Sequence, residues 1–327
     1  MTVTLADVLY TLAAPALVAL LVAWLMALAL PRDVAARWKL ASGAAIGFAV
    51  GYVLLPDWAP LWPNRHWLWL PWLSLAGGVL GAVSIGGPVR AWEQWLVAAV
   101  ACFASAVAIV PDWPDLQPPR TILLPLVAGY LLLLYTALAF LPRRLQGRTF
   151  TALLALAAFG TASLVAYEVS VKYGQLGATS AAAFIGVAIC VLLSRKANDA
   201  ETDEAALPSH VATSNRSLVL LYSIALGGLA FVSTIEPTER PYALLLAPAA
   251  PWMLWLFTLP PLARLPISMA VILQALAVAA VIALVAGWLL YSAEPETDDW
   301  SAVGPRNVSS DRLACIQAKC GLNLTRS

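Results

Sequence analysis

Charged residues are scarce in this sequence of 327 residues. Lys, Arg, Asp and Glu make up 11% of the chain, whereas soluble globular domains average about 25%. The 19 basic and 18 acidic residues leave a formal net charge of +1, and no basic block stands out, so nothing favours nucleic-acid binding. Too few polar residues are present to cover a soluble globule, and lipid is the expected outer solvent.

Histidines and catalytic motifs are nearly missing as well. The only two histidines, His66 and His210, are separated by five apolar segments, which places them on opposite sides of a membrane. They cannot share a metal ion, and a catalytic zinc normally needs three protein ligands. No G-x-S-x-G, H-E-x-x-H or phosphate-binding loop is present. We expect no enzyme, no metal and no cofactor.

Cysteine is sparse and carries little information. Cys102 and Cys190 fall in apolar runs, where a thiol behaves as a small hydrophobic side chain. Cys315 and Cys320 lie in a polar C-terminal region with C-x4-C spacing, which supplies too few ligands for zinc. Whether these two form a disulfide is left open.

Long apolar runs dominate what the sequence does contain. Hydrophobic residues make up 61% of the chain, and the mean hydropathy is +0.81. Ten apolar runs have the length, or nearly so, to cross a hydrocarbon core of about 30 Å, and their continuous apolarity favours helices over barrel strands. We predict an all-α, polytopic helical bundle in which 40–55, which is short, and 242–259, which prolines interrupt, are the weakest spans. The ten runs are 9–30, 40–55, 67–87, 91–110, 121–141, 150–171, 178–194, 217–235, 242–259 and 266–291.

The basic residues predict the orientation of the bundle. With ten crossings, the loops on one side carry eleven Lys and Arg residues and the loops on the other side carry four. Because Lys and Arg accumulate in cytoplasmic loops, both termini are predicted to be extracytoplasmic, in a bacterial inner membrane. We expect a transmembrane domain at 1–291 with a cytoplasmic linker at 195–216, followed by a flexible extracytoplasmic tail at 292–327.

A ten-residue pattern occurs twice, in two predicted outer loops. It reads PDWAPLWPNR at 56–65 and PDWPDLQPPR at 111–120. The first proline of each copy stops the incoming helix, and the tryptophan suits the headgroup level of the membrane. The aspartate of each copy can pair with its arginine. A third outer loop, at 235–241, again sets acids beside an arginine.

Two interpretations of these loops are open. In one, the three loops converge into a charged, tryptophan-rich vestibule that binds a small polar solute through its arginines. In the other, the loops form an aromatic belt with exposed ion pairs that contribute about 0–1 kcal/mol each. The candidate solute-binding residues in the loops are Asp57, Trp58, Arg65, Asp112, Trp113, Arg120, Glu236 and Arg240.

Glu168 completes the set of candidates, because an acid within a spanning segment is costly and points to function. It lies about one turn from the predicted outer end, and Lys172 follows at i+4 on what would be the same helix face. An interfacial salt bridge is therefore weighed against a proton or cation site. Gln274, in the last segment, is expected to bond to another helix.

Glycines recur every four residues in two neighbouring segments. Gly43, Gly47 and Gly51 lie in the second segment, and Gly77 and Gly81 lie in the third. Such stripes let helix backbones approach closely, so the hairpin of these two segments is expected to be a tightly packed unit.

The two decapeptides, together with KYGQLGA at 172–178, resemble a family of uncharacterised multi-pass membrane proteins from planctomycete-type bacteria. The likeness extends to about residue 291, and the family brings no known activity. Two functions are open: a permease-like protein for a small polar solute, and a non-catalytic envelope scaffold that acts through its outer loops and tail. The lipid bilayer is the expected partner, and the oligomeric state is open.

Overall fold

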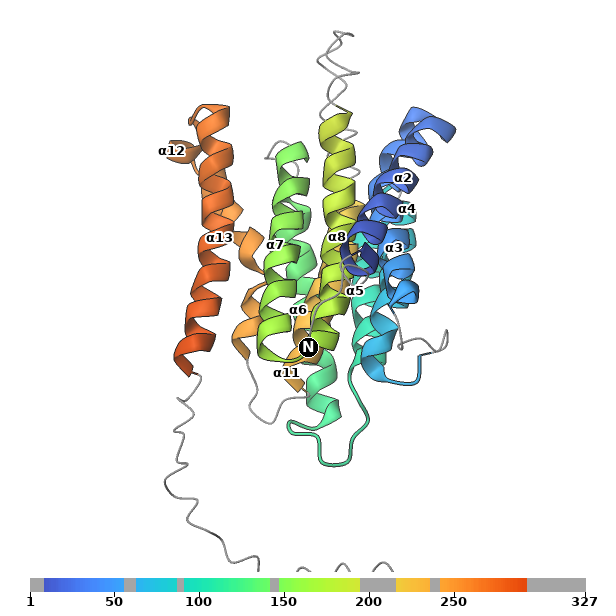
Figure 1. Cartoon of the computed structure of the whole chain (residues 1–327), viewed down its shortest axis with the longest axis vertical. Helices are drawn as coiled ribbons and strands as arrows, with labels where there is room; N and C mark the ends of the chain where they lie inside the picture. The colour runs from blue at the N-terminus through green and yellow to red at the C-terminus, as the bar shows by residue number, and fades with distance from the viewer. Residues whose placement is uncertain are drawn as a thin grey trace, which may run out of the picture. The chain divides into compact units, whose positions relative to one another are not determined.

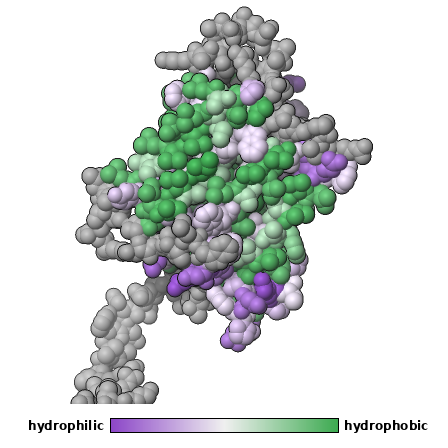
Figure 2. All heavy atoms as spheres, turned by 90° about the vertical axis from the view of Figure 1, so that its right-hand side faces the viewer, coloured by the Kyte–Doolittle hydropathy of each residue, from purple (hydrophilic) through white to green (hydrophobic). Residues whose placement is uncertain are grey.

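The computed structural model describes residues 9–55, 63–86, 91–141, 147–194, 216–235 and 242–292, and this part of the chain contains helices and no strands. Eight of the described helices are long and apolar enough to cross a membrane. In Figure 2, hydrophobic residues cover most of the visible face, and hydrophilic residues gather below them. The predicted class, an all-α multi-pass membrane protein, is confirmed.

The helices form a bundle in which helices consecutive in the chain run antiparallel to each other (Figure 1). We call the helix Arg216–Ile235, which contains η4 and α11, the central helix. The π-helical elements are η1 and η4, and the 3₁₀ elements are η2, η5 and η6. The bounds are η1 (Leu9–Ala13), α2 (Ala14–Ala29), α3 (Arg32–Leu54), η2 (His66–Trp69), α4 (Leu70–Gly86), α5 (Ala91–Ile109), α6 (Arg120–Ala139), α7 (Gly147–Glu168), α8 (Val171–Leu193), η4 (Ser223–Gly227), α11 (Gly228–Ile235), η5 (Tyr242–Leu246), η6 (Ala250–Thr258), α12 (Pro260–Ala263) and α13 (Ile267–Ser292).

Two of the ten predicted spans differ from the other eight. The apolar part of α3 is only Trp38–Leu54, although the whole helix has 23 residues, about 34 Å at the α-helical rise. Tyr242–Thr258 is not an α-helix but two 3₁₀ pieces, η5 and η6. At the 3₁₀ rise of about 2.0 Å per residue, the 5 residues of η5 extend over about 10 Å and the 9 residues of η6 over about 18 Å. The whole of α3 therefore has the length of a span, and neither 3₁₀ piece has it alone.

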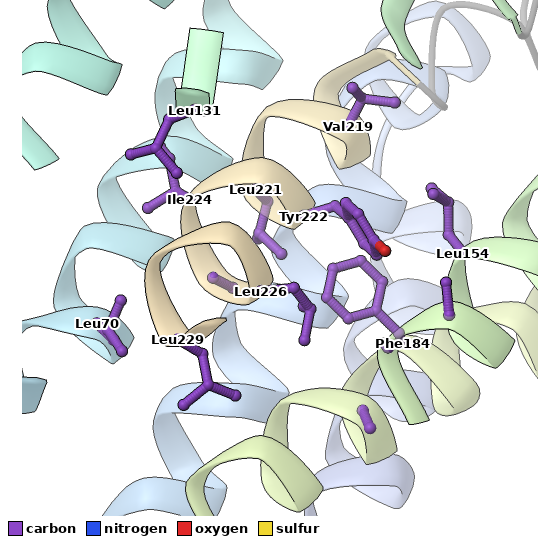
Figure 3. Packing of buried hydrophobic residues seen from close by; sticks show 14 of the residues in the cluster. Leu70, Leu131, Leu154, Phe184, Val219, Leu221, Tyr222, Ile224, Leu226 and Leu229 are labelled. Carbon is purple, nitrogen blue, oxygen red and sulfur yellow. The ribbon is translucent and has the colours of Figure 1, made fainter. Parts of the chain in front are cut away.

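The central helix is the most buried of the described spans. Its apolar window is 94% buried, whereas the windows of α2 and α13 are each 17% buried and leave their apolar side chains to lipid. Figure 3 shows the central helix surrounded by other helices, with Tyr222 meeting Phe184 of α8 edge-on at a ring-centroid distance of 5.5 Å. The centre of the bundle is therefore a packed, largely aliphatic core.

Glycine lets three helices approach closely at one side of this core. A Cβ atom on Gly47 of α3 would lie 2.7 Å from both the Ala19 Cβ and the Pro15 carbonyl oxygen of α2, and 3.2 Å from the Ala183 Cβ of α8. Gly77 and Gly81 of α4 instead face the central helix. Close approach at these glycines is present, but their nearest contacts are with α2, α8 and the central helix, and none of the five predicted glycines has its nearest contacts in the other helix of the expected α3–α4 hairpin.

Parts of four segments discussed above lie outside the described residues. These are 56–62 of the first outer loop, 195–215 of the predicted cytoplasmic linker, 236–241 of the third outer loop and 293–327 of the predicted tail. By chain contacts, the described residues up to Leu290 form one compact unit. The functional site is built from this unit alone.

Replacing Gly47 by alanine is expected to lower the free energy of unfolding by about 1–3 kcal/mol, because the added methyl group would overpack the α2–α3–α8 contact. The matched control is Gly129→Ala on α6, where an added methyl group has nothing within 4 Å. Thermal unfolding of both variants in one detergent measures the difference. Equal midpoints would contradict the close packing at Gly47.

Candidate functional site

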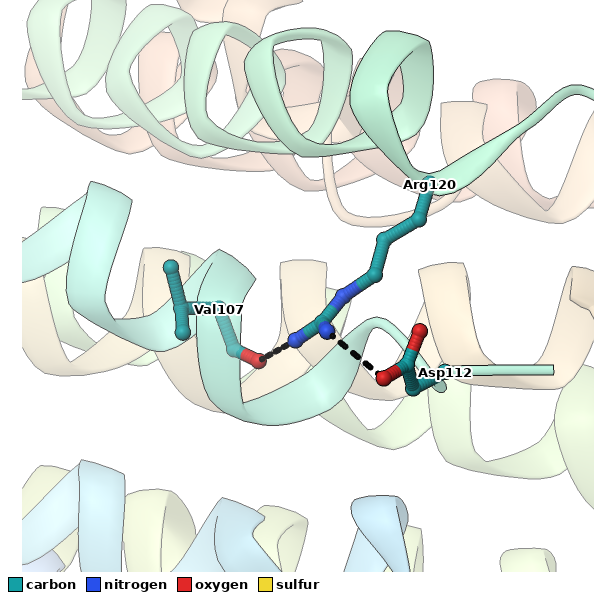
Figure 4. A network of polar contacts seen from close by, with 3 residues as sticks. All are labelled: Val107, Asp112 and Arg120. Carbon is teal, nitrogen blue, oxygen red and sulfur yellow. Dashed lines mark hydrogen bonds and ion pairs between the residues drawn. The ribbon is translucent and has the colours of Figure 1, made fainter.

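The second decapeptide is the best-described part of the predicted vestibule. Arg120 begins α6, and its Nη1 lies 3.3 Å from Oδ2 of Asp112 in the loop that joins α5 to α6 (Figure 4). Its Nη2 donates a hydrogen bond of 3.3 Å to the carbonyl oxygen of Val107, near the end of α5. The ion pair expected within this decapeptide is therefore present, and it joins the two ends of the loop.

The residue that follows the first decapeptide meets the second decapeptide through an aromatic contact. Arg65, which precedes η2, is exposed, and the ring of the next residue, His66, packs edge-on against Trp113 with the centroids 5.3 Å apart. The ends of two predicted outer loops thus lie side by side. Asp57, Trp58, Glu236 and Arg240 lie outside the described residues, so the convergence of all three loops stays a prediction.

Glu168 has a different position from the one its spacing predicts. α7 ends at Glu168, and α8 begins at Val171 after Ser170, whose hydroxyl accepts a hydrogen bond of 3.3 Å from the backbone N–H of Tyr173. Glu168 and Lys172 are therefore on different helices, and the i, i+4 argument for a pair on one face is wrong. Glu168 is half-buried at the end of α7, in agreement with its predicted place near the end of a span.

A cavity of about 200 Å³ lies between α6, the central helix and η5. The same loop that holds Asp112 closes it, through Leu116, Gln117 and Pro118. None of the candidate residues taken from the sequence lines this cavity. The full lining is Leu116, Gln117, Pro118, Leu123, Leu126, Val127, Tyr130, Phe231, Thr234, Ile235, Tyr242 and Leu245.

The walls of the cavity are apolar because two of their polar groups already have partners within the wall. The Tyr130 hydroxyl donates a hydrogen bond of 2.8 Å to the carbonyl oxygen of Leu245, and the Thr234 hydroxyl donates one of 2.7 Å to that of Phe231. No charged side chain is among the described residues that line the cavity. Polar groups entering it would lose water without gaining charged partners, so the cavity suits hydrocarbon.

The mouth of the cavity is marked by exposed side chains. Leu126 on α6 is 58% exposed and Tyr242 on η5 is 57% exposed, whereas Val127 and Phe231 behind them are buried. A leucine exposed on a spanning helix faces lipid, and a tyrosine near a helix end suits the headgroup level. The exposed side chains that line the cavity thus include the apolar Leu126 and the amphipathic Tyr242, at the end of the bundle that carries the second decapeptide.

Side-chain donors fix the discontinuous segment that forms one wall. The Tyr222 hydroxyl of the central helix donates to the carbonyl oxygen of Pro248 at 3.0 Å, as Tyr130 of α6 does to that of Leu245. In return, Trp255 of η6 donates through Nε1 to the carbonyl oxygen of Ala137 at 2.9 Å. The π-helical turn η4 follows Tyr222 directly, as is common beside functional sites.

The comparisons add no relative to this description. Neither the protein-family models nor the curated proteins nor the solved structures gave a significant match to the chain. The resemblance to multi-pass proteins of planctomycete-type bacteria stays a prediction. Within the described residues, no group of three or more His, Cys, Asp and Glu side chains is placed to hold a metal ion.

Removing the Tyr222 hydroxyl with Tyr222→Phe is expected to lower the free energy of unfolding by about 0.6–2 kcal/mol, because the Pro248 carbonyl loses its donor inside the bundle. Tyr167→Phe on the exposed face of α7 is the control, since it removes the same atom at a surface position. Unfolding midpoints in detergent compare the two. A midpoint for Tyr222→Phe as high as that of the control would show that this bond does not hold the segment.

Proposed function

We propose that this multi-pass membrane protein binds the hydrocarbon chain of a membrane amphiphile in the cavity between α6, the central helix and η5. The observation that carries the proposal is an apolar cavity whose mouth is lined by the exposed Leu126 and Tyr242. A volume of about 200 Å³ equals roughly six to seven times the 30 Å³ that a water molecule occupies in the liquid. That space suits part of one chain.

Lipid is the ligand source that this geometry favours. A chain that leaves the bilayer for an apolar cavity exchanges one hydrocarbon surrounding for another, so it loses no hydration. A small polar solute would have to shed water against walls in which the hydroxyl groups of Tyr130 and Thr234 are already bonded. The permease-like function for such a solute thus draws less support from the described residues, and the aqueous vestibule it needs includes Asp57, Glu236 and Arg240, which lie outside them.

The proposal includes an orientation for the bundle. Ten crossings, with α3 and the η5–η6 segment counted as spans, put both termini outside the cytoplasm and the cavity in the extracytoplasmic half of a bacterial inner membrane. The 23-residue length of α3, about 34 Å, supports counting it as a span. The protein then presents its lipid site to the outer leaflet, and the proposal includes no catalytic step. A scaffold role for the outer loops is compatible with it.

Substituting Leu126 by tryptophan is expected to block the mouth of the cavity and to weaken the binding of a photoactivatable alkyl-chain lipid by about tenfold, or roughly 1.4 kcal/mol. Leu133→Trp is the matched control, because Leu133 is 53% exposed on the same helix and does not line the cavity. Crosslinking yield against probe concentration in detergent measures both. Should the two variants label like the wild type, the cavity is not the chain site.

A further inference from the structure

We infer that the Asp112–Arg120 ion pair recognises the head group of the bound amphiphile, and that this head group is zwitterionic, with a phosphate for Arg120 and an ammonium for Asp112. The inference rests on the proposed chain site and names the class of its ligand. It concerns two side chains for which the fold has no other evident use beyond joining the ends of the α5–α6 loop.

The ion pair and the cavity share the α5–α6 loop and the first turn of α6. Arg120 precedes the cavity residue Leu123 by three positions, about 4.5 Å along α6. Asp112 belongs to the same short loop as Leu116 and Pro118, which close the cavity. A chain inserted past Leu126 would therefore leave its polar end within reach of the pair.

The pair is accessible and incompletely bonded. The side chain of Asp112 is 84% exposed and that of Arg120 is 34% exposed, and they share one contact of 3.3 Å. Nε of Arg120 is buried and has no hydrogen-bond partner. An exposed pair with a single contact is weak. Each member can therefore leave the other and bind a ligand group at little cost in free energy. Nη1 of Arg120, once released from Asp112, then donates a strong charge-assisted hydrogen bond to a phosphate.

The balance of charge selects the head group. One cation and one anion form a site without net charge, and a ligand that also carries one of each satisfies both. A purely anionic head group would gain Arg120 but would lie beside the carboxylate of Asp112, which repels it. An uncharged head group would leave both members of the pair as they are. Phosphatidylethanolamine fits this arrangement, since its ammonium group can donate hydrogen bonds to Asp112.

Competition against the photoactivatable alkyl-chain lipid tests the inference in the full-length protein in detergent. We expect phosphatidylethanolamine to displace the probe at a concentration about fivefold lower than phosphatidylglycerol or diacylglycerol requires. Asp112→Asn removes the repulsion and leaves the arginine, so it should shift the preference to phosphatidylglycerol. Asp115→Asn, at an exposed position of the same loop, is the control and should keep the wild-type order.

The outcomes separate this inference from the proposed function. The ion pair does not recognise a zwitterionic head group if the wild type binds phosphatidylglycerol best or binds all three lipids equally. The same conclusion follows if Asp112→Asn keeps the wild-type order. The chain site survives those results as long as Leu126→Trp still reduces labelling. If Leu126→Trp has no effect, the proposed function itself fails. Unfolding midpoints of the loop variants show that each one is folded.

Discussion

The interior of a bilayer offers no hydrogen-bond partner to a polypeptide, and this constraint organises the whole bundle. The eight long described helices meet it with their own backbone bonds. The segment Tyr242–Thr258 is divided into two 3₁₀ pieces around Pro248, and proline has no N–H to continue a helix. Carbonyl groups of this segment accept hydrogen bonds from tyrosine hydroxyl groups of neighbouring helices. The non-helical backbone is tolerated because it is enclosed by protein.

The same bonds account for the character of the cavity. Tyr130 faces the cavity, but its hydroxyl is engaged by Leu245, so the wall it contributes is the aromatic ring. From the divided segment, η5 contributes Tyr242 and Leu245 to the cavity wall, and this wall is apolar where the Leu245 carbonyl oxygen is already bonded to Tyr130. Discontinuous helices in membrane proteins are often where ligands bind. In the proposed function the cavity holds hydrocarbon, next to the α5–α6 loop whose ends the Asp112–Arg120 pair joins.

Much of the fold follows from the sequence, because the transfer of apolar side chains into lipid is nearly additive along a segment. Hydropathy therefore identifies the long spans, and it marks 40–55 and 242–259 as the weak ones, which the structure gives shorter apolar runs. The Asp112–Arg120 pair could be predicted because both residues belong to one short loop. The start of α8 could not be predicted, because the polar sequence around Lys172 resembles a loop. One capping residue, Ser170, decides where the helix begins. The cavity was missed because its walls come from segments more than a hundred residues apart. The only sequence signal near the cavity was the set of prolines that interrupt the 242–259 segment.

An experimental structure of the protein in lipid nanodiscs tests the central claim most directly, namely that a side-chain-braced break in the bundle holds a hydrocarbon chain. The account predicts elongated density between Leu123, Val127 and Phe231 that continues past Leu126 into the lipid, with the Tyr130 and Tyr222 hydroxyls on the carbonyl groups of Leu245 and Pro248. A continuous α-helix over 242–258, or a cavity filled by protein side chains, would contradict it.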